Sequence, residues 1–182
     1  RFKTNDSNIS ITKQGGLVSY MVKNRDISSQ SLTNENGLKV SGQYLKSLGI
    51  NNIVPTYHEI RNNIKTINYA HEIEGVVYYT DLIKVSVAMD SGEIMGFDAR
   101  GYIVNNKVRE FAPPSISKEK AITVISPLLK VEDIKLTVIP TNNIQEELTY
   151  QLTCKTEDDK PILVYINAYS GKEEDILILI IT

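Results

Sequence analysis

Residues 32–38 read Leu-Thr-Asn-Glu-Asn-Gly-Leu, and residues 116–122 read Ile-Ser-Lys-Glu-Lys-Ala-Ile. Across this offset of 84 residues the segments share an apolar, a hydroxyl-bearing, a glutamate, a small and an apolar position in the same order. A second match follows at an offset of 79, where residues 91–93 (Ser-Gly-Glu) correspond to residues 170–172 (Ser-Gly-Lys). Self-similarity at a nearly fixed period is typical of repeated structural units, so the sequence predicts two copies of one unit of roughly 80 residues.

Each copy opens with a predicted helix. Thr33 and Ser117 are suitable N-caps, because their hydroxyl oxygens can accept hydrogen bonds from the unpaired amides of a first helical turn. The spacing predicts one helix over 32–48 and another over 117–126, the second ending before Pro127. The apolar stripes that would face the sheet are Leu38, Leu45 and Leu48 in the first helix and Ile122, Ile125 and Leu129 in the second.

Strands are predicted where apolar and polar residues alternate with a period of two. These segments are residues 9–11, 17–21, 83–89, 93–97, 148–154, 162–166 and the apolar run 176–181. A helix followed by an antiparallel meander is an α+β unit, with the helix on one face of the sheet. We therefore predict one lobe over 28–108, a second over 112–182, and a proline-stiffened linker at 111–114. Residues 1–27, which form a hairpin around Gly15 and Gly16, are predicted to be the terminal strands of a partial upstream lobe.

The amino-acid composition alone argues against some classes of function. Twenty Lys and Arg stand against twenty-two Asp and Glu, for a formal charge of -2. A chain without a basic surplus is a poor candidate for nucleic-acid binding, and its binding to a partner should depend only weakly on salt. The longest apolar run is far shorter than the roughly 18–20 residues that cross a bilayer. The chain begins without Met and ends inside an apolar run, so we expect a fragment of a longer protein.

The residues that could carry chemistry are few. Cys154 has no second cysteine to pair with and continues an apolar strand face, which favours a buried position. His58 and His71 are 13 residues apart and lack the spacing of a helical zinc motif. The acidic runs 146–147 and 157–159 are typical of solvated turns and not of a paired-carboxylate glycosidase site. We therefore expect no enzymatic activity, no metal and no cofactor.

Tyrosine is the more suggestive residue type, with ten Tyr, three Phe and no Trp. Tyr78 and Tyr79 lie in a stretch interpreted as turn-like, ahead of the strand at 83–89, and are the candidate partner contacts. Tyrosine favours interfaces because its ring is apolar while its hydroxyl tolerates water. The alternative is that these rings, like Tyr165 and Tyr169, cover a sheet face within their own lobe.

The helix and the hairpin together resemble the PepSY domain. That domain ends in a strand, a D-x-x-T/S-G-E/K turn and a second strand, and both copies carry a version of it. The first version is Asp-Ser-Gly-Glu at 90–93, and the second is Asn-Ala-Tyr-Ser-Gly-Lys at 167–172. The hairpin alone is weak, but it gains specificity from the capped helix that precedes it twice. The resemblance implies tandem PepSY-like lobes.

A narrower resemblance is to the YpeB family of spore germination proteins. Residues 15–21 together with Arg25 are similar to that family's GG-x-V-x-W-M…R stretch. Residues 75–85 are similar to its G-V-x-x-Y-P-D-x-I-K-V stretch, and residues 92–102 to its G-E-I-x-G-F-x-A-x-G-Y stretch. The likeness spans nearly the whole chain and corresponds to the family's C-terminal PepSY region. Tyr20 replaces the common Trp, and Thr80 replaces the usual Pro of the second stretch.

This resemblance implies a function and a location. Members of the family act in the spore, outside the inner membrane on the cortex side, and are held there by an N-terminal anchor that precedes the region resembled here. They are needed for the presence and control of the cortex-lytic enzyme SleB, and they carry no known catalytic group. The expected partner is therefore a SleB-like hydrolase, which the chain would bind, stabilise or inhibit during germination.

Two alternatives remain open from the sequence. One is an envelope module that binds a ligand or glycan, which would require a concave groove lined by aromatic rings and convergent polar groups. The other is a propeptide-like inhibitor of a peptidase, since PepSY domains also occur in the propeptides of metallopeptidases. A partner of the hydrolase should instead present a flat or edge-strand surface of protein-interface size.

Overall fold

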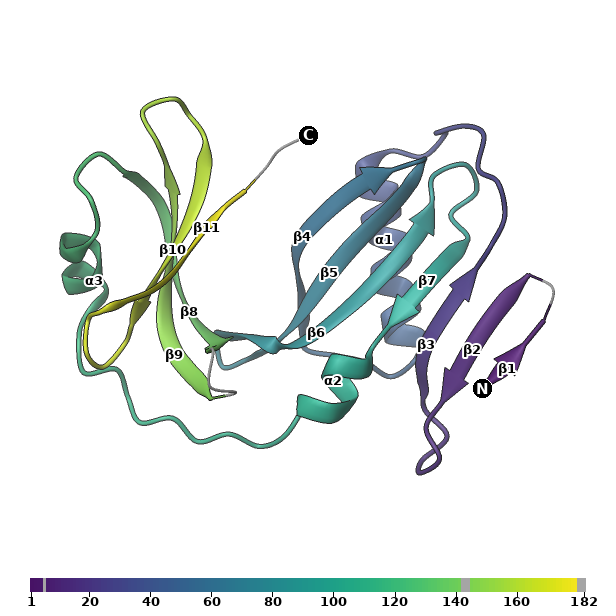
Figure 1. Ribbon diagram of the computed structural model, residues 1–182, viewed down its shortest axis with the longest axis horizontal. Helices are drawn as coiled ribbons and strands as arrows, with labels where there is room; N and C mark the ends of the chain where they lie inside the picture. Colours follow the sequence, from purple (N-terminus) through teal and green to yellow (C-terminus); the bar gives the residue numbers. More distant parts are fainter. Residues whose placement is uncertain (5, 142–144, 180–182) are drawn as a thin grey trace. The chain divides into compact units, whose positions relative to one another are not determined.

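The computed structural model describes residues 1–4, 6–141 and 145–179. The described residues form three helices and eleven strands (Figure 1). The helices are α1 (Asn34–Ser47), α2 (Arg100–Asn105) and α3 (Lys118–Val124). The strands are β1 (Phe2–Lys3), β2 (Ser7–Ile11), β3 (Val18–Lys23), β4 (Ile53–Arg61), β5 (Ile64–Ile73), β6 (Val76–Ala88), β7 (Ile94–Asp98), β8 (Lys130–Pro140), β9 (Glu146–Lys155), β10 (Pro161–Asn167) and β11 (Glu173–Ile178).

The chain divides into two compact units. Unit 1 comprises 1–72 and 80–107, and unit 2 comprises 73–79 and 108–182. In each unit a helix is followed by a four-stranded meander, α1 by β4–β7 and α3 by β8–β11, and unit 1 also contains the short helix α2. The α+β fold class predicted from the repeat is thereby confirmed.

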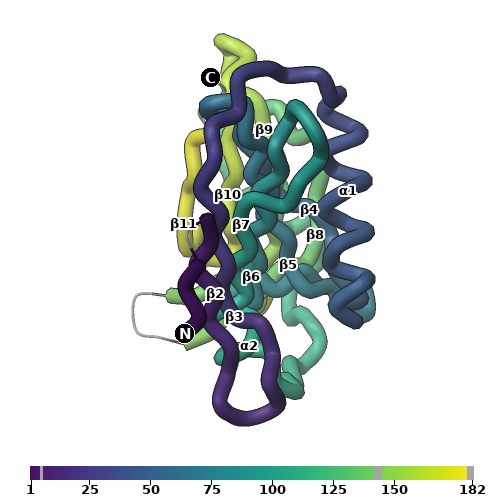
Figure 2. The backbone as a smooth tube through the Cα atoms, turned by 90° about the vertical axis from the view of Figure 1, so that its right-hand side faces the viewer, coloured from purple at the N-terminus to yellow at the C-terminus, as the bar shows by residue number. Residues whose placement is uncertain are grey.

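Unit 1 is built on a seven-stranded sheet. Its strand order is β1-β2-β3-β7-β6-β5-β4. The predicted hairpin around Gly15 and Gly16 is present as β2 and β3, and β3 pairs antiparallel with β7. Residues 1–27 thus extend the sheet of the first complete copy, and the prediction that they close an upstream lobe stays a prediction. Figure 2 shows α1 along one side of this sheet, which leaves the opposite face uncovered by any helix.

Helix α1 begins where the sequence predicts. The Thr33 hydroxyl accepts a hydrogen bond from the Asn36 amide, which completes the N-cap. The predicted leucine stripe is wrong in part, because Leu38 and Leu48 are 38% and 40% exposed while Leu45 is fully buried. The buried face is instead Gly37, Ser41 and Leu45. The small residues Gly37 and Ser41 let the helix axis approach the sheet closely.

The core of unit 1 joins α1 to the inward faces of the central strands. Leu45 packs with apolar residues of β5, β6 and β7. These are Ile67, Tyr69, Ile83, Val85, Val87 and Phe97. The Tyr69 hydroxyl lies 2.6 Å from the Ser41 hydroxyl, so the one polar side chain on the buried helix face is hydrogen-bonded.

Unit 2 repeats the scheme with a shorter helix. The Ser117 hydroxyl caps α3 by accepting from the Lys120 amide, as predicted. The helix ends at Val124, two residues before the predicted end. Its buried position is the small residue Ala121, while Ile122 of the predicted stripe is 39% exposed. The other two residues of the predicted stripe do contact the core, since Ile125 is 9% exposed and Leu129 packs against the same cluster.

The hairpin turns of the two repeats have the same hydrogen bonds. The Gly92 amide donates to the Ala88 carbonyl at 2.8 Å, and the Gly171 amide donates to the Asn167 carbonyl at 3.0 Å. Both glycines have φ near +75°, at 78° and 71°, where a side chain would be strained. The 79-residue offset between the two turns is the offset read from the sequence.

The segments before the two helices also correspond. The Leu32 amide donates to the Met89 carbonyl at 2.8 Å, and the Ile116 amide donates to the Ala168 carbonyl at 3.2 Å. Each bond ties the start of a helix to the hairpin turn of its own unit. The repeat is therefore conserved at the level of individual backbone hydrogen bonds, although few side chains match.

Several elements differ from the sequence prediction. Helix α2 was not predicted, and β4 and β5 were not delimited. The turn expected at Tyr78 and Tyr79 is wrong, because both residues lie within the 13-residue strand β6. The final apolar run is strand β11 as far as Ile178, and residues 180–182 lie outside the described residues. No helix in the described ranges is long and apolar enough to cross a membrane.

Candidate functional site

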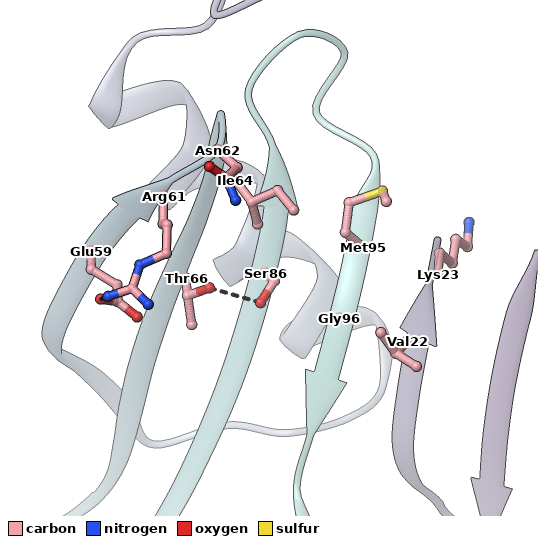
Figure 3. Close-up of a pocket in the computed structure, with 10 residues that line it drawn as sticks. All are labelled: Val22, Lys23, Glu59, Arg61, Asn62, Ile64, Thr66, Ser86, Met95 and Gly96. Atoms are coloured by element: carbon pink, nitrogen blue, oxygen red, sulfur yellow. Dashed lines mark hydrogen bonds and ion pairs between the residues drawn. The ribbon is translucent and has the colours of Figure 1, made fainter. Parts of the chain in front are cut away.

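The uncovered face of the unit 1 sheet carries a shallow groove of about 290 Å³ (Figure 3). One row of directly paired residues crosses five strands and forms its floor. The row runs Val22, Gly96, Ser86, Thr66 and Glu59. A Cβ atom at Gly96 would come within 3.1 Å of Ser86, so the glycine keeps the floor open. The Thr66 and Ser86 hydroxyls lie 2.9 Å apart and bond to each other.

The rim of the groove is charged. Lys23 contributes an ammonium that is already paired with Glu93 at 2.6 Å. Arg61 is 80% exposed at its side chain and lies 3.6 Å from the Glu59 carboxylate. These groups can bind polar or anionic groups of a partner by hydrogen bonds and charge. Surface pairs of this kind are worth about 0–1 kcal/mol each.

The groove lacks the parts of a catalytic site. A serine or threonine nucleophile needs an adjacent base, but the Ser86 hydroxyl is bonded to Thr66 and no histidine lines the groove. No aromatic ring is among its described lining residues, so it also lacks the stacking platform expected of a glycan site. What remains is a shallow surface of mixed apolar and charged side chains, with Val22, Ile64 and Met95 among them, suited to contacts with another macromolecule.

A second charged cluster lies at the tip of the first PepSY-like hairpin. Arg25 donates to both Asp90 carboxylate oxygens at 2.8 Å and to Glu93 at 2.8 Å, and it also reaches the Ser91 hydroxyl. The hydrogen bonds from Arg25 hold the pKa of the Asp90 carboxyl well below its usual range. For Glu93, the hydrogen bond from Lys23 is the larger cause of a lowered pKa and Arg25 the second. This cluster explains the Asp-Ser-Gly-Glu motif as a clamp between β3 and the β6–β7 turn.

The two histidines do not meet. His58 on β4 faces Ile67, while His71 is four residues further along β5. Four residues of strand span about 13 Å, too far for both imidazoles to hold one metal ion. Burial, followed by the charge of Lys65, lowers the pKa of His58. Among the described residues, no group of three or more His, Cys, Asp or Glu could hold a metal ion.

His71 has a different partner that the sequence did not indicate. Its Nδ1 atom is 3.8 Å from Asp81 Oδ2, and the Asp81 side chain is fully buried. The His71 ring also meets the Tyr102 ring edge-on, with centroids 5.8 Å apart. Asp81 belongs to the family-like stretch 75–85, which was the one available signal for it. The geometry is that of a structural pair inside unit 1.

The candidate contacts Tyr78 and Tyr79 lie on opposite faces of β6. Tyr78 is 6% exposed, packs in the unit 2 core and has the Arg109 guanidinium 5.1 Å from its ring centroid. Tyr79 donates its hydroxyl to Gln151 Oε1 at 2.6 Å and meets the Tyr165 ring edge-on. Burial raises the pKa of Tyr79 to about 12. Both rings therefore pack within unit 2 and not in the predicted lobe over 28–108, and their contact with a partner stays a prediction.

The remaining candidates have structural positions. Cys154 is fully buried in the unit 2 core, and burial raises the pKa of its thiol. Glu146 forms a two-point ion pair with Arg109, whose side chain is 4% exposed. Glu147 accepts a hydrogen bond from Asn167 at 3.2 Å. Residues 157–159 occupy the exposed β9–β10 turn, as expected.

Comparison with known proteins gives a consistent answer. Residues 1–112 match the family described as YpeB sporulation, PepSY1 and PepSY2 domains. The chain is similar to the Sporulation protein YpeB of Bacillus subtilis (strain 168), at 29% identity over 168 residues, covering 91% of this chain and 37% of that protein. It is also similar to the protein of the same description from Oceanobacillus iheyensis, at 26% identity over 161 residues, covering 88% and 36%. The chain thus spans just over a third of the length of these relatives.

A solved structure matches nearly the whole chain. It is described as the Bacillus megaterium YpeB C-terminal domain, with a TM-score of 0.90 and 26% sequence identity. The match covers 97% of this chain and 78% of the solved one. The fold described above is therefore the fold of that domain.

Proposed function

The chain belongs to the YpeB sporulation family, through its PepSY1 and PepSY2 domains, and from that premise we propose that it is a non-catalytic protein of the spore that binds a SleB-like cortex-lytic hydrolase. Binding would stabilise or inhibit the hydrolase and so act in germination. The proposed location is outside the inner membrane, on the cortex side. We also infer that residues 1–27 end an upstream PepSY domain, because residues 1–112 match a family model that comprises PepSY1 and PepSY2.

The observation that carries the proposal is that each unit has a free strand edge. Among the described strands, β4 pairs only with β5, and β11 pairs only with β10. A free edge offers backbone amides and carbonyls that an extended segment of another protein can satisfy by strand addition. Because the chain has two units, its partner could bind both of them. Once the partner is bound to one unit, the effective concentration for its contact with the other is raised.

The non-catalytic part of the proposal is supported by the chemistry of the described side chains. The groove on unit 1 presents hydroxyls that bond to each other and charges that are already paired. The alternative of a glycan-binding module receives less support, because the groove lacks aromatic lining residues over its described extent. A protein partner can bind such a surface without aromatic lining residues.

Co-purification of the chain with the cortex-lytic hydrolase tests the proposal. We expect a stable complex, together with slower muramyl-bond cleavage or longer survival of the hydrolase against added protease. A folded chain that neither binds the hydrolase nor changes its activity or its survival would contradict the proposal. Turnover of peptidoglycan by the chain alone would contradict its non-catalytic part.

A further inference from the structure

The chain as a whole is nearly neutral, but its two units carry net charges of opposite sign. Unit 1 contains twelve Lys and Arg against nine Asp and Glu, a formal charge of +3. Unit 2 contains eight Lys and Arg against thirteen Asp and Glu, a formal charge of -5. The total of -2 that predicted weak salt dependence therefore describes neither unit. A partner that meets only unit 2 meets an acidic surface.

Strand β11 is a free edge of unit 2 (Figure 1). All six of its residues are exposed. Its first half, Glu173–Asp175, is wholly acidic, and its second half, Ile176–Ile178, is wholly apolar. The exposed fractions of Ile176, Leu177 and Ile178 are 43%, 45% and 68%. By contrast, the other long edge strand, β4, is interrupted by Pro55 and a register shift. Edge strands are commonly protected by such features, and β11 has no proline.

The backbone of β11 shows which groups face its free side. The Leu179 amide donates to the Pro161 carbonyl at 3.1 Å, and Leu177 faces Leu163. In an antiparallel pair, facing residues are hydrogen-bonded alternately. Leu177 is therefore bonded to β10, whereas Ile176 and Ile178 direct their amides and carbonyls to the free side.

One of these two outward amides is already covered. The Ile176 amide donates to its neighbour's carboxylate, Asp175 Oδ1, at 2.8 Å. The Asp175 carboxylate over the edge disfavours pairing with another acidic strand. It therefore also disfavours pairing with β11 of a second copy, whose unit 2 carries a formal charge of -5. A strand that carries Lys or Arg here would attract the carboxylate away from the amide and neutralise it. This arrangement favours a partner strand that carries Lys or Arg over an acidic one.

We propose that the free edge of β11 receives an extended segment of the partner protein, with apolar residues beside Ile176–Ile178 and Lys or Arg beside Glu173–Asp175. The inference rests on the proposed function and names the site and chemistry of that binding. The partner strand would bond the Ile178 amide and the outward carbonyls of β11. Its apolar side chains would cover those of Ile176 and Ile178, which are exposed on one face of the strand.

Three variants of the chain test this site with the cortex-lytic hydrolase as the probe. Ile178→Pro removes an outward amide without removing a hydrogen bond to β10, and Ile178→Lys adds a charge at the same place. Leu128→Lys is the matched control, because Leu128 is 66% exposed and the substitution adds the same charge elsewhere in unit 2. We expect both Ile178 variants to weaken binding about tenfold or more, and Leu128→Lys to change it less than about twofold.

Charge and backbone protection provide independent measurements. Glu173→Lys should weaken binding and flatten its salt dependence relative to the unmodified chain. Hydrogen exchange at the amides of residues 176–178 should slow when the hydrolase is added. Circular dichroism and thermal melting of each variant check that the fold is retained.

The outcomes separate this inference from the function on which it rests. If the hydrolase binds the unmodified chain and the Ile178 variants equally well, the β11 site is wrong while the proposed function stands. If the unmodified chain does not bind at all, both fail. If sedimentation shows that the chain alone dimerises and that Ile178→Pro abolishes the dimer, the occupant is a second copy and the basic partner is wrong.

Discussion

Lys65, the second residue of β5, donates from its ammonium group to the carbonyl oxygen of Asn34, the first residue of α1, at 2.9 Å. The residue is 2% exposed, and burial lowers the pKa of its amine. A buried lysine is tolerated here because its stem packs along the helix while its tip reaches a carbonyl at the helix start. The approach is possible because α1 has glycine at position 37, over which the stem passes.

Gly37→Ala should destabilise the protein by about 1–2 kcal/mol. The added Cβ atom would lie 3.1 Å from Lys65 Cδ and 3.3 Å from Met89 Sδ, both buried. Gly42→Ala is the control in the same helix, since its Cβ would meet only the Tyr69 hydroxyl at 4.0 Å. That change should be neutral or stabilise by up to about 1 kcal/mol through helix propensity. Equal effects of the two changes in urea unfolding would show that close packing at Gly37 is unimportant.

Arg25→Gln should lower the melting temperature by a few degrees and flatten the loss of stability in acid. The pKa of Asp90 is lowered in the folded state, so its contribution is present above the unfolded value near 3.8 and is lost as the pH falls through the folded value. Arg61→Gln, which removes an 80% exposed guanidinium, is the control. Thermal melts between pH 2 and pH 7 measure both variants. An unchanged acid limb in Arg25→Gln would contradict the clamp.

Stability should fall in alkali because of Tyr79. Its pKa is raised from 10.0 to about 12 in the folded state, so the unfolded chain releases this proton first. The free energy of unfolding should therefore decline by roughly 1–3 kcal/mol as the pH rises from 10 to 12. Tyr79→Phe should show a shallower decline, while Tyr57→Phe, at a 43% exposed position, should follow the unmodified chain. Parallel declines in all three proteins would remove Tyr79 as the cause.

Arg109→Met should destabilise the protein by about 2–4 kcal/mol, because it leaves the Glu146 carboxylate without its two-point partner. The double change Arg109→Met with Glu146→Gln should recover much of the loss, since it removes the stranded charge. Chemical unfolding of the single and double variants measures both effects. A double variant less stable than the single one would mean that the pair contributes mainly through other contacts.

The features best predicted from the sequence are those set by local chemistry. Thr33 and Ser117 cap their helices because a hydroxyl before a helical segment has nearby amides to accept from. The turns at Gly92 and Gly171 are equally local, since a positive φ favours glycine. Such signals need no knowledge of the rest of the fold, and they were sufficient to locate the repeat.

What the sequence did not reveal depends on packing between distant segments. The buried helix faces use Gly37 and Ala121, which carry too little hydrophobicity to be distinguished from surface residues. Arg25 was visible only as part of a family-like stretch, because its carboxylate partners lie 65 and 68 residues away. Tyr78 and Tyr79 were misassigned because β6 has 13 residues, and its first residues pair with β8, which lies 60 residues further along the chain.

That long strand, β6, contributes residues to both units. Residues 76–78 pair in parallel with residues 136–138 of β8, and Tyr78 lies in the core of unit 2, although the chain then continues into unit 1. A gene fragment beginning at residue 108 would encode a sheet without its outermost strand and a core without one of its aromatic rings. Recombination at the proline linker would therefore exchange incomplete modules. In this architecture unit 2 is completed by a strand segment, residues 76–78, that the coding sequence of the first repeat supplies.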